Sequence, residues 1–152
     1  MIFDKVSLVT GGFDPLHSGH IAYFKAAKEL GMLGVGVNSD EWLVRKKGKF
    51  FMTAAERISI IKELKCVDLV IEFRDHDDTA NDAIDMALQV YDKIIFCNGG
   101  DRTKGNIPEM EKYGNNDRVE FKWGVGGMDK KNSSSWILKD YLKVESGSSA
   151  IK

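Results

Sequence analysis

The ten residues from Gly11 to His20, GGFDPLHSGH, have the types and spacing best suited to chemistry. They follow a short apolar run, Val6–Val9, and precede a segment with helical spacing. A strand, a glycine-rich turn and a helix start form an anion site in that order, because unpaired backbone N–H groups and the helix dipole point into one concavity. His17 and His20 add two further donors. The combination suits a nucleoside triphosphate and a reaction at its α-phosphate.

The two histidines can serve one anion. We expect His17 before the helix and His20 in its first turn, with Gly11 and Gly12 leaving room for a phosphate to approach the backbone. A neutral imidazole donates one hydrogen bond, and an imidazolium adds charge. The alternatives are a metal site that includes Asp14 and a purely structural histidine pair. A dinucleotide fingerprint is a weak interpretation, because the loop lacks G-x-G-x-x-G.

The elements that would hold this loop alternate between strands and helices. Apolar runs predict strands at Val6–Val9, Leu33–Val37, Asp68–Phe73, Lys93–Cys97 and Arg118–Trp123. Helical spacing lies between them, and Thr53 with Glu56 has the spacing of a capping box. Such alternation predicts a Rossmann-like α/β domain, a five-stranded parallel sheet with helices on both faces. Ligands then bind at the carboxyl ends of the strands, in loops that include 11–19, 38–49, 74–78, 98–106 and 124–132.

The composition excludes several classes of protein. A chain of 152 residues with net charge −1 is typical of one soluble domain and gives no electrostatic case for nucleic-acid or membrane binding. No apolar run is long enough to span a bilayer, and no signal peptide is visible. Cys66 and Cys97 are interpreted as buried thiols in a reducing compartment, so we expect a cytoplasmic protein. The domain is expected over residues 1–142, with a flexible tail at 143–152.

The chain resembles the H-x-G-H superfamily of nucleotidyltransferases. These include cytidylyltransferases for glycerol, choline and ethanolamine phosphates, and adenylyltransferases for heptose phosphate, pantetheine phosphate and flavin mononucleotide. The resemblance rests on His17-Ser18-Gly19-His20 and continues in the family's order at 37–41, 56–57, 66–68, 99–101 and 133–134. It implies a Rossmann-like fold and a homodimer.

The resemblance also implies catalytic roles. His17 and His20 would bind the triphosphate and stabilise the five-coordinate α-phosphorus. Lys46, on a mobile lid after the second strand, would contact substrate or leaving phosphate; the alternative for residues 45–49 is a solvated basic loop. The loop before the histidines would bind nucleotide, with backbone amides holding phosphate oxygens, through Gly11, Gly12, Phe13 and Asp14.

The rest of the nucleotide site would come from later loops. The resemblance places nucleoside recognition at Gly99, Asp101 and Arg102, with a turn cap as the alternative for Asp101. Ser133 and Ser134 would bind the triphosphate at the start of the last helix, a role compatible with simple N-capping.

Departures from the family bear on the base. Many cytidylyltransferases have R-T-E-G before the Ser/Thr pair, whereas this chain has Met128-Asp129-Lys130-Lys131 and lacks the arginine. Gly99-Gly100-Asp101 and Val37-Asn38-Ser39-Asp40 look more like the heptose phosphate adenylyltransferases. Chain size and the relatives with small acceptors favour CTP, and ATP is the alternative.

The reaction that follows is nucleotidyl transfer. A phosphate oxygen of a phosphorylated small molecule attacks the α-phosphorus, and pyrophosphate leaves in line. The nucleophile is already an anion, so catalysis needs positioning and charge stabilisation rather than a general base. Mg²⁺ would accompany the triphosphate and needs few protein ligands, so we predict no protein-held metal site. Two alternatives are a nucleotide-sensing module without turnover and a part of a larger biosynthetic chain.

Overall fold

Parallel strands form the centre of the fold. The computed structural model describes residues 3–99, 107–126 and 133–147, and side chains up to residue 143. Its strands are β1 (Phe3–Gly11), β2 (Met32–Val37), β3 (Leu69–Glu72), β4 (Tyr91–Cys97) and β5 (Val119–Lys122). All pairings are parallel, in the order β3-β2-β1-β4-β5. The predicted Rossmann-like α/β domain with a five-stranded parallel sheet is confirmed.

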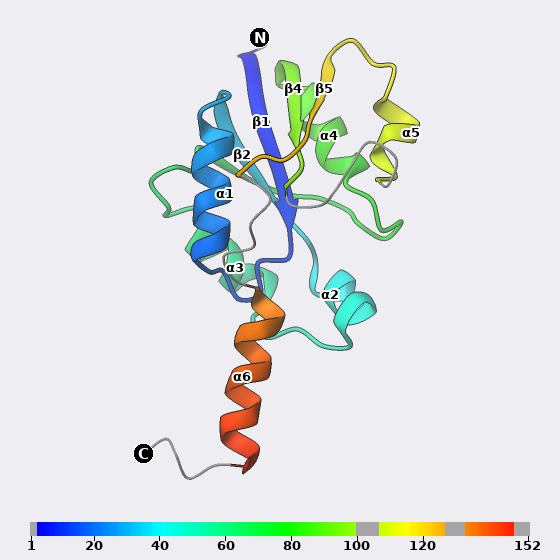
Figure 1. The fold of residues 1–152 in the computed structure, drawn as a ribbon. Coiled ribbons are helices and arrows are strands. Elements are labelled where there is room, and N and C mark those ends of the chain that lie inside the picture. The colour runs from blue at the N-terminus through cyan, green and yellow to red at the C-terminus, as the bar shows by residue number, and fades with distance from the viewer. Residues whose placement is uncertain (1–2, 100–106, 127–132, 148–152) are drawn as a thin grey trace.

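Helices cover both faces of this sheet. α1 (Ser18–Lys28) and α3 (Ala54–Ile61) pack on one face, where Phe24 and Ile61 meet Val35. α4 (Asn81–Leu88) and α5 (Glu109–Tyr113) pack on the other, where Ile84 meets Phe96. Figure 1 shows α1 and α4 on opposite sides of the strands. Both faces of each central strand are therefore buried, as its continuous apolar sequence requires.

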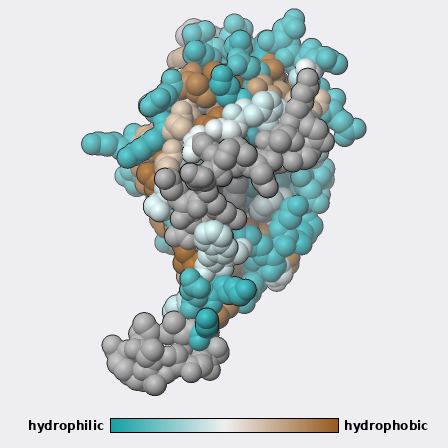
Figure 2. Space-filling view, viewed as in Figure 1, coloured by the Kyte–Doolittle hydropathy of each residue, from teal (hydrophilic) through white to brown (hydrophobic). Residues whose placement is uncertain are grey.

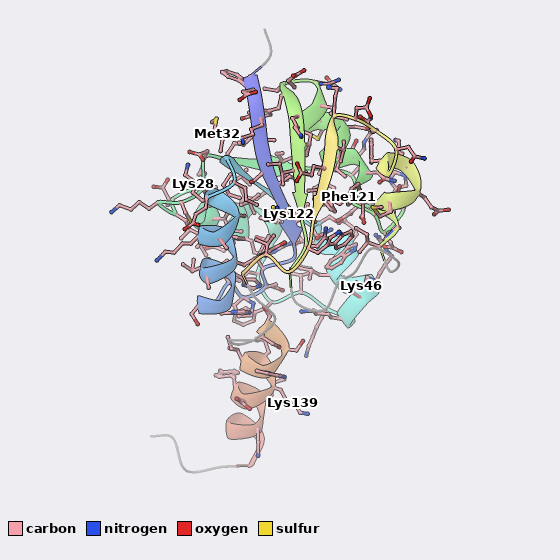
Figure 3. The ribbon with its side chains drawn as sticks, turned by 45° about the horizontal axis from the view of Figure 1, so that its top comes forward. Lys28, Met32, Lys46, Phe121, Lys122 and Lys139 are labelled. Carbon is pink, nitrogen blue, oxygen red and sulfur yellow. The ribbon has the colours of Figure 1, made fainter. Side chains whose placement is uncertain are left out.

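The remaining helices lie beyond the carboxyl ends of the strands. α2 (Asp40–Lys47) follows β2, and α6 (Ser134–Gly147) extends away from the sheet (Figure 1). Figure 3 shows Lys46 on α2 and Lys139 on α6 at this end of the molecule, and Met32 at the opposite end. The strand order reverses around β1 and β4, so the expected ligand crevice is at this edge. α6 runs past residue 142, where we had expected the domain to end.

Two helices were missed in the sequence. Residues 38–49 were predicted to be a loop, but α2 occupies most of them. Five of its eight residues are charged and its three apolar residues are consecutive, so it lacks the apolar period that indicates a helix. Its end signals are nonetheless complete. The Ser39 hydroxyl accepts from Trp42 N at 3.0 Å, and Gly48 closes the helix in the left-handed conformation. The short α5 has no comparable pattern.

The described surface is mostly hydrophilic in the view of Figure 2, with smaller hydrophobic patches between polar side chains. None of the helices in the described ranges is long and apolar enough to cross a membrane. Both cysteines are free thiols. Cys97 is buried as predicted, whereas Cys66 is only partly buried.

Candidate functional site

The two histidines form the first turn of α1 together. His17 is the N-cap residue, and its Nδ1 accepts from Gly19 N at 3.0 Å. In return, Nδ1 of His20 accepts from His17 N at 3.2 Å. This is a capping box built from two imidazoles. The rings stack with centroids 3.8 Å apart, as the H-x-G-H spacing on a helix start allows.

These capping bonds select the tautomer of both rings. A nitrogen that accepts a backbone N–H carries no proton, so a neutral imidazole must hold its proton on Nε2. His20 is neutral: burial, the neighbouring His17 and the ammonium of Lys47 lower its pKa to about 3. Both rings can therefore offer Nε2–H donors to an anion, and His20 does so without carrying charge beforehand.

The ring of Phe13 packs against His20. Its ring meets His20 edge-on at 5.0 Å and Phe24 at 5.3 Å between centroids. Its backbone is left-handed, with φ of 55°, a conformation that bulky residues rarely adopt. The buried ring holds the turn in this shape and fixes the position of His20.

The two glycines make room for neighbouring side chains. A Cβ at Gly11 would lie 2.9 Å from Phe13 Cζ, and one at Gly12 would lie 2.8 Å from Leu43 Cδ2. Gly11 admits the ring that supports His20, and Gly12 admits α2. The approach of a phosphate to this backbone stays a prediction.

Asp14 is occupied by protein. Its buried carboxylate accepts from Phe51 N at 2.5 Å and from Met52 N at 2.7 Å. It therefore connects the histidine loop to the segment between α2 and α3. The structure places Asp14 next to the predicted nucleotide loop as a support for that loop.

The start of α6 reaches the same loop. Ser134 Oγ donates to Pro15 O at 2.6 Å, and Ser133 Oγ accepts from Trp136 N at 3.1 Å as an N-cap would. Helix N-termini from opposite ends of the chain thus meet at the loop that carries the histidines. Both have the dipole orientation that favours an anion.

Gly99 lies at the end of β4, where a Cβ would be 3.1 Å from Tyr23 Cε1. It therefore lies beside α1, next to the turn that bears His20. Asp101 and Arg102, which we expected to recognise the nucleoside, lie outside the described residues.

The predicted lysine points elsewhere. Lys46 Nζ lies over the Trp42 ring, 5.7 Å from its centroid (Figure 3). Among the described lysines, it is the ammonium of Lys47 that lowers the pKa of His20. Adjacent residues on a helix point about 100° apart, so only one of the two can face the histidines.

α2 is held at several points by the loop after β3. The buried Asp75 carboxylate accepts from Ser39 N at 2.8 Å, from Ser39 Oγ at 2.6 Å and from Asn38 Nδ2 at 3.0 Å. Arg45 donates to Asp75 O at 2.6 Å and to Asp78 Oδ1 at 3.0 Å. These bonds fix the helix that carries both lysines.

Arg57 is the residue that sequence reasoning missed. Its side chain is fully buried. It donates to Gly12 O at 2.9 Å, Asn38 O at 2.7 Å and Met52 O at 2.9 Å, and it pairs with Asp40 at 2.7 Å. One guanidinium thus satisfies carbonyls from the three loops around the site. Glu56-Arg57 appeared only as a point of family resemblance, and nothing local signals a buried arginine.

A cavity of about 490 Å³ opens at the same edge of the sheet, beyond β2 and β3. Its lining combines apolar side chains, four carboxylates and one arginine; the lining residues are Val37, Ser39, Asp40, Glu41, Ala54, Glu72, Phe73, Arg74, Asp82 and Met86. Asp40 links it to the histidine loop through Arg57 and Gly12. Within the described ranges, no group of three or more His, Cys, Asp or Glu is arranged to hold a metal.

A family model described as cytidylyltransferase-like matches residues 8–120. The match includes the histidine loop, α2 and Arg57. The chain belongs to the cytidylyltransferase-like family. The nucleotidyltransferase superfamily expected from H-x-G-H is therefore shown.

Similar curated proteins are longer than this chain. Bifunctional protein HldE of Geobacter metallireducens is 33% identical over 143 residues, which is 90% of this chain and 28% of that protein. HldE of Pelobacter propionicus is 34% identical over the same length and shares. The chain thus spans little more than a quarter of these relatives.

Solved structures share the fold. The lipopolysaccharide core biosynthesis protein of Thermoplasma volcanium has a TM-score of 0.61 and 29% identity, covering 85% of this chain and 98% of that one. A putative nicotinate-nucleotide adenylyltransferase of Vibrio parahaemolyticus has a TM-score of 0.64, covering 93% and 88%. Its identity of 12% supports the fold alone.

Proposed function

We propose that this protein transfers AMP from ATP to the phosphate of a sugar phosphate and releases pyrophosphate. The observation that carries the proposal is the capping box of His17 and His20. It keeps two imidazoles stacked at a helix start, with both Nδ1 atoms occupied. The Nε2–H groups are then preorganised donors for an anion, the arrangement that stabilises charge developing at a phosphorus centre.

The chain's own groups would act as follows. An acceptor phosphate oxygen forms a bond to the α-phosphorus while the bond from that phosphorus to the bridging oxygen of pyrophosphate breaks. His17 and His20 donate to the phosphate oxygens, and Lys47 supplies positive charge beside them. The N-termini of α1 and α6 favour the triphosphate through their amides. No side chain has to remove a proton, because the acceptor phosphate is already ionised.

The choice of base follows from the relatives. From the sequence alone, chain size and the relatives with small acceptors favour CMP transfer. The HldE relatives favour an adenylyltransferase that acts on a sugar phosphate, in agreement with the resemblance at Gly99-Gly100-Asp101. We therefore propose ATP as the nucleotide, with CTP as the alternative that the experiment tests.

The cavity beyond β2 and β3 suits the body of a sugar acceptor. Carboxylates accept hydrogen bonds from hydroxyl groups, and they repel further phosphates. Glu41 and Glu72 in the lining would thus admit a polyol carrying one phosphate, with that phosphate directed to the histidines, while Asp82 is paired with Arg74.

We propose that Mg²⁺ arrives with the triphosphate. The donors at this site are N–H groups and lysines, which suit phosphates rather than a cation, and the Asp14 carboxylate is engaged by Phe51 N and Met52 N. Bound Mg²⁺ would neutralise charge on the phosphates and keep most of its water ligands. The homodimer and the cytoplasmic location stay predictions.

The test is pyrophosphate release from ATP, CTP, GTP and UTP against sugar phosphates and glycerol 3-phosphate. We expect turnover with ATP and a sugar phosphate. His17→Asn keeps the N-cap acceptor but removes the imidazole, so kcat should fall roughly a hundredfold with the fold intact. Preference for CTP with glycerol 3-phosphate would restore CMP transfer. NTP binding without pyrophosphate release would indicate a sensor.

A further inference from the structure

Tyr23 contacts the segments that follow two other strands. It lies on α1 one turn after His20, and its hydroxyl donates to Cys97 O at 2.9 Å. A Cβ at Gly99 would be 3.1 Å from Tyr23 Cε1, and one at Gly126 would be 3.6 Å from Tyr23 Cδ1. Both glycine backbones therefore pack directly on this tyrosine, one after β4 and one after β5.

These two segments are also bonded to each other. Asn98 N donates to Lys122 O at 2.8 Å, and Val125 N donates to Asn98 O at 3.0 Å. The ladder between β4 and β5 thus continues past the ends of the strands. Asn98–Gly99 and the turn at Gly124–Gly126 form one unit. The Tyr23 side chain determines the distance between this unit and α1.

We propose that Tyr23 is the positioning residue for nucleoside selection, an inference that rests on the nucleotidyl transfer proposed above. The nucleoside is expected at the end of β4, and the histidines act on the phosphates. Because residues 99 and 126 are glycines, main-chain groups of the two segments form the wall against which the nucleoside would bind. Because Tyr23 joins this wall to α1, it fixes the position of the wall and thereby how well the base fits against it.

This role predicts a particular kinetic signature. A wall that contacts the nucleoside binds ground state and transition state alike, so its displacement raises the KM of the NTP and leaves kcat. It also lowers the preference for the correct base, because the main-chain donors and acceptors lose their register. A loss of stability alone would change neither the KM of the NTP nor the preference for the correct base.

The experiment compares Tyr23→Phe and Tyr23→Leu with the wild type. Tyr23→Phe keeps the ring, removes the hydroxyl that donates to Cys97 O and should raise the KM for ATP about threefold. Tyr23→Leu also removes the ring. It should raise that KM about tenfold and reduce the preference for ATP over CTP by a similar factor, with kcat within about twofold. The KM of the sugar phosphate should be unchanged.

Two further variants separate positioning from folding. Tyr113→Phe removes a tyrosine hydroxyl on the opposite face, where it donates to Asp85 and to Asn81 O. It should lower the melting temperature without changing the KM for ATP. Gly99→Ala places a methyl group against the Tyr23 ring, so its effect should be smaller in the Tyr23→Leu background. That rescue is partial, because Val125 O is 3.2 Å from the same methyl position.

Each outcome decides the proposal. The proposal is overturned if Tyr23→Leu lowers kcat with an unchanged KM for ATP. It is also overturned if Tyr23→Leu has the same kcat and KM values as Tyr113→Phe. If the wild type binds ATP but releases no pyrophosphate, the proposed function fails. The Kd values for ATP and CTP then replace KM, and unchanged values in Tyr23→Leu overturn the inference. A wild type that binds neither nucleotide overturns both.

Discussion

At the scale of single residues, His20 combines two tasks that conflict in most proteins. As part of the capping box it must keep Nδ1 free of a proton, and as a phosphate donor it must keep a proton on Nε2. The neutral imidazole satisfies both, and burial, His17 and Lys47 lower its pKa to about 3 to keep it neutral. A bound triphosphate brings negative charge, so it should raise this pKa.

The lowered pKa of His20 predicts a pH dependence of folding. Between the unfolded value of 6.5 and the folded value of about 3, the unfolded chain binds a proton that the folded chain does not. Stability should therefore fall as the pH drops from 6.5 towards 3, with a contribution of about 1.4 kcal/mol per pH unit from this group. His20→Asn keeps an acceptor for His17 N and should flatten the curve. Urea unfolding between pH 7 and pH 4 measures both slopes.

The control is His76→Asn, the same change at an exposed histidine on the loop after β3. Asp68, Asp77 and Asp82 have lowered pKa values and add their own losses at acidic pH. Those losses are common to the wild type and His20→Asn and cancel between them, whereas His76→Asn also removes a charge that helps to lower the pKa of Asp77 and Asp82. Equal slopes in the wild type and His20→Asn would mean that folding does not change the pKa of His20.

Residue types in the sequence predicted the histidines well and their supports poorly. H-x-G-H placed His17 before the helix and His20 in its first turn, since spacing along a helix is a local property. Nucleotide binding by Asp14 and by the glycines at 11 and 12 stays a prediction, and the structure adds that they also contact protein groups. Those partners are Met52, Phe13 and Leu43, and the fully buried Arg57 binds three loops. Such contacts depend on tertiary packing, which no local pattern encodes.

At the scale of elements, α2 is the part of the site that a pattern search overlooks. The strands were predicted because buried parallel strands are continuously apolar, and this property is visible in the sequence. Leu43 is the one buried residue of α2, so its sequence shows charges rather than a period. Its Ser39 cap, acidic first turn, basic last turn and Gly48 were sufficient signals. The basic run at 45–47 is thus the end of a helix, and its charges favour that end.

The orientation of α2 predicts which lysine acts. Lys47→Ala should lower kcat by about tenfold or more, because it removes a positive charge next to His20 and the transferring phosphate. It should also raise the pKa of His20, since the Lys47 ammonium is one of the groups that lower it. Steady-state kinetics and an NMR titration of the imidazole measure the two effects in one variant.

Lys46→Ala is the matched control, one residue away on the same helix turn. Lys46 lies over Trp42, so its loss should leave the pKa of His20 unchanged and alter kcat less than twofold. If Lys46→Ala were the more damaging variant, α2 would have to rotate when the nucleotide binds. Lys46, as predicted from the sequence, would then be the lysine that contacts the phosphates.

At the scale of the whole molecule, the site joins the two ends of the fold. Ser134 Oγ and Pro15 O are 119 residues apart in the sequence and form a hydrogen bond of 2.6 Å. The triphosphate site would therefore be complete only when α6 is seated on the histidine loop. A nucleotide that contacts both helix N-termini binds the folded chain alone and stabilises it by linkage.

This connection predicts how ATP changes the stability of the protein. At a concentration of about 100 times its Kd, ATP with Mg²⁺ should stabilise the fold by about 2.7 kcal/mol, or roughly 5–10 °C in the melting temperature.

Ser134→Ala removes the bond to Pro15 O, so it should lower the melting temperature without nucleotide by a few degrees. It should also reduce the increase caused by ATP, because α6 no longer holds its N-terminus over the phosphates. Ser135→Ala, at the neighbouring exposed position, should preserve the full increase. An undiminished ATP effect in Ser134→Ala would mean that the triphosphate is bound by the α1 loop without help from α6.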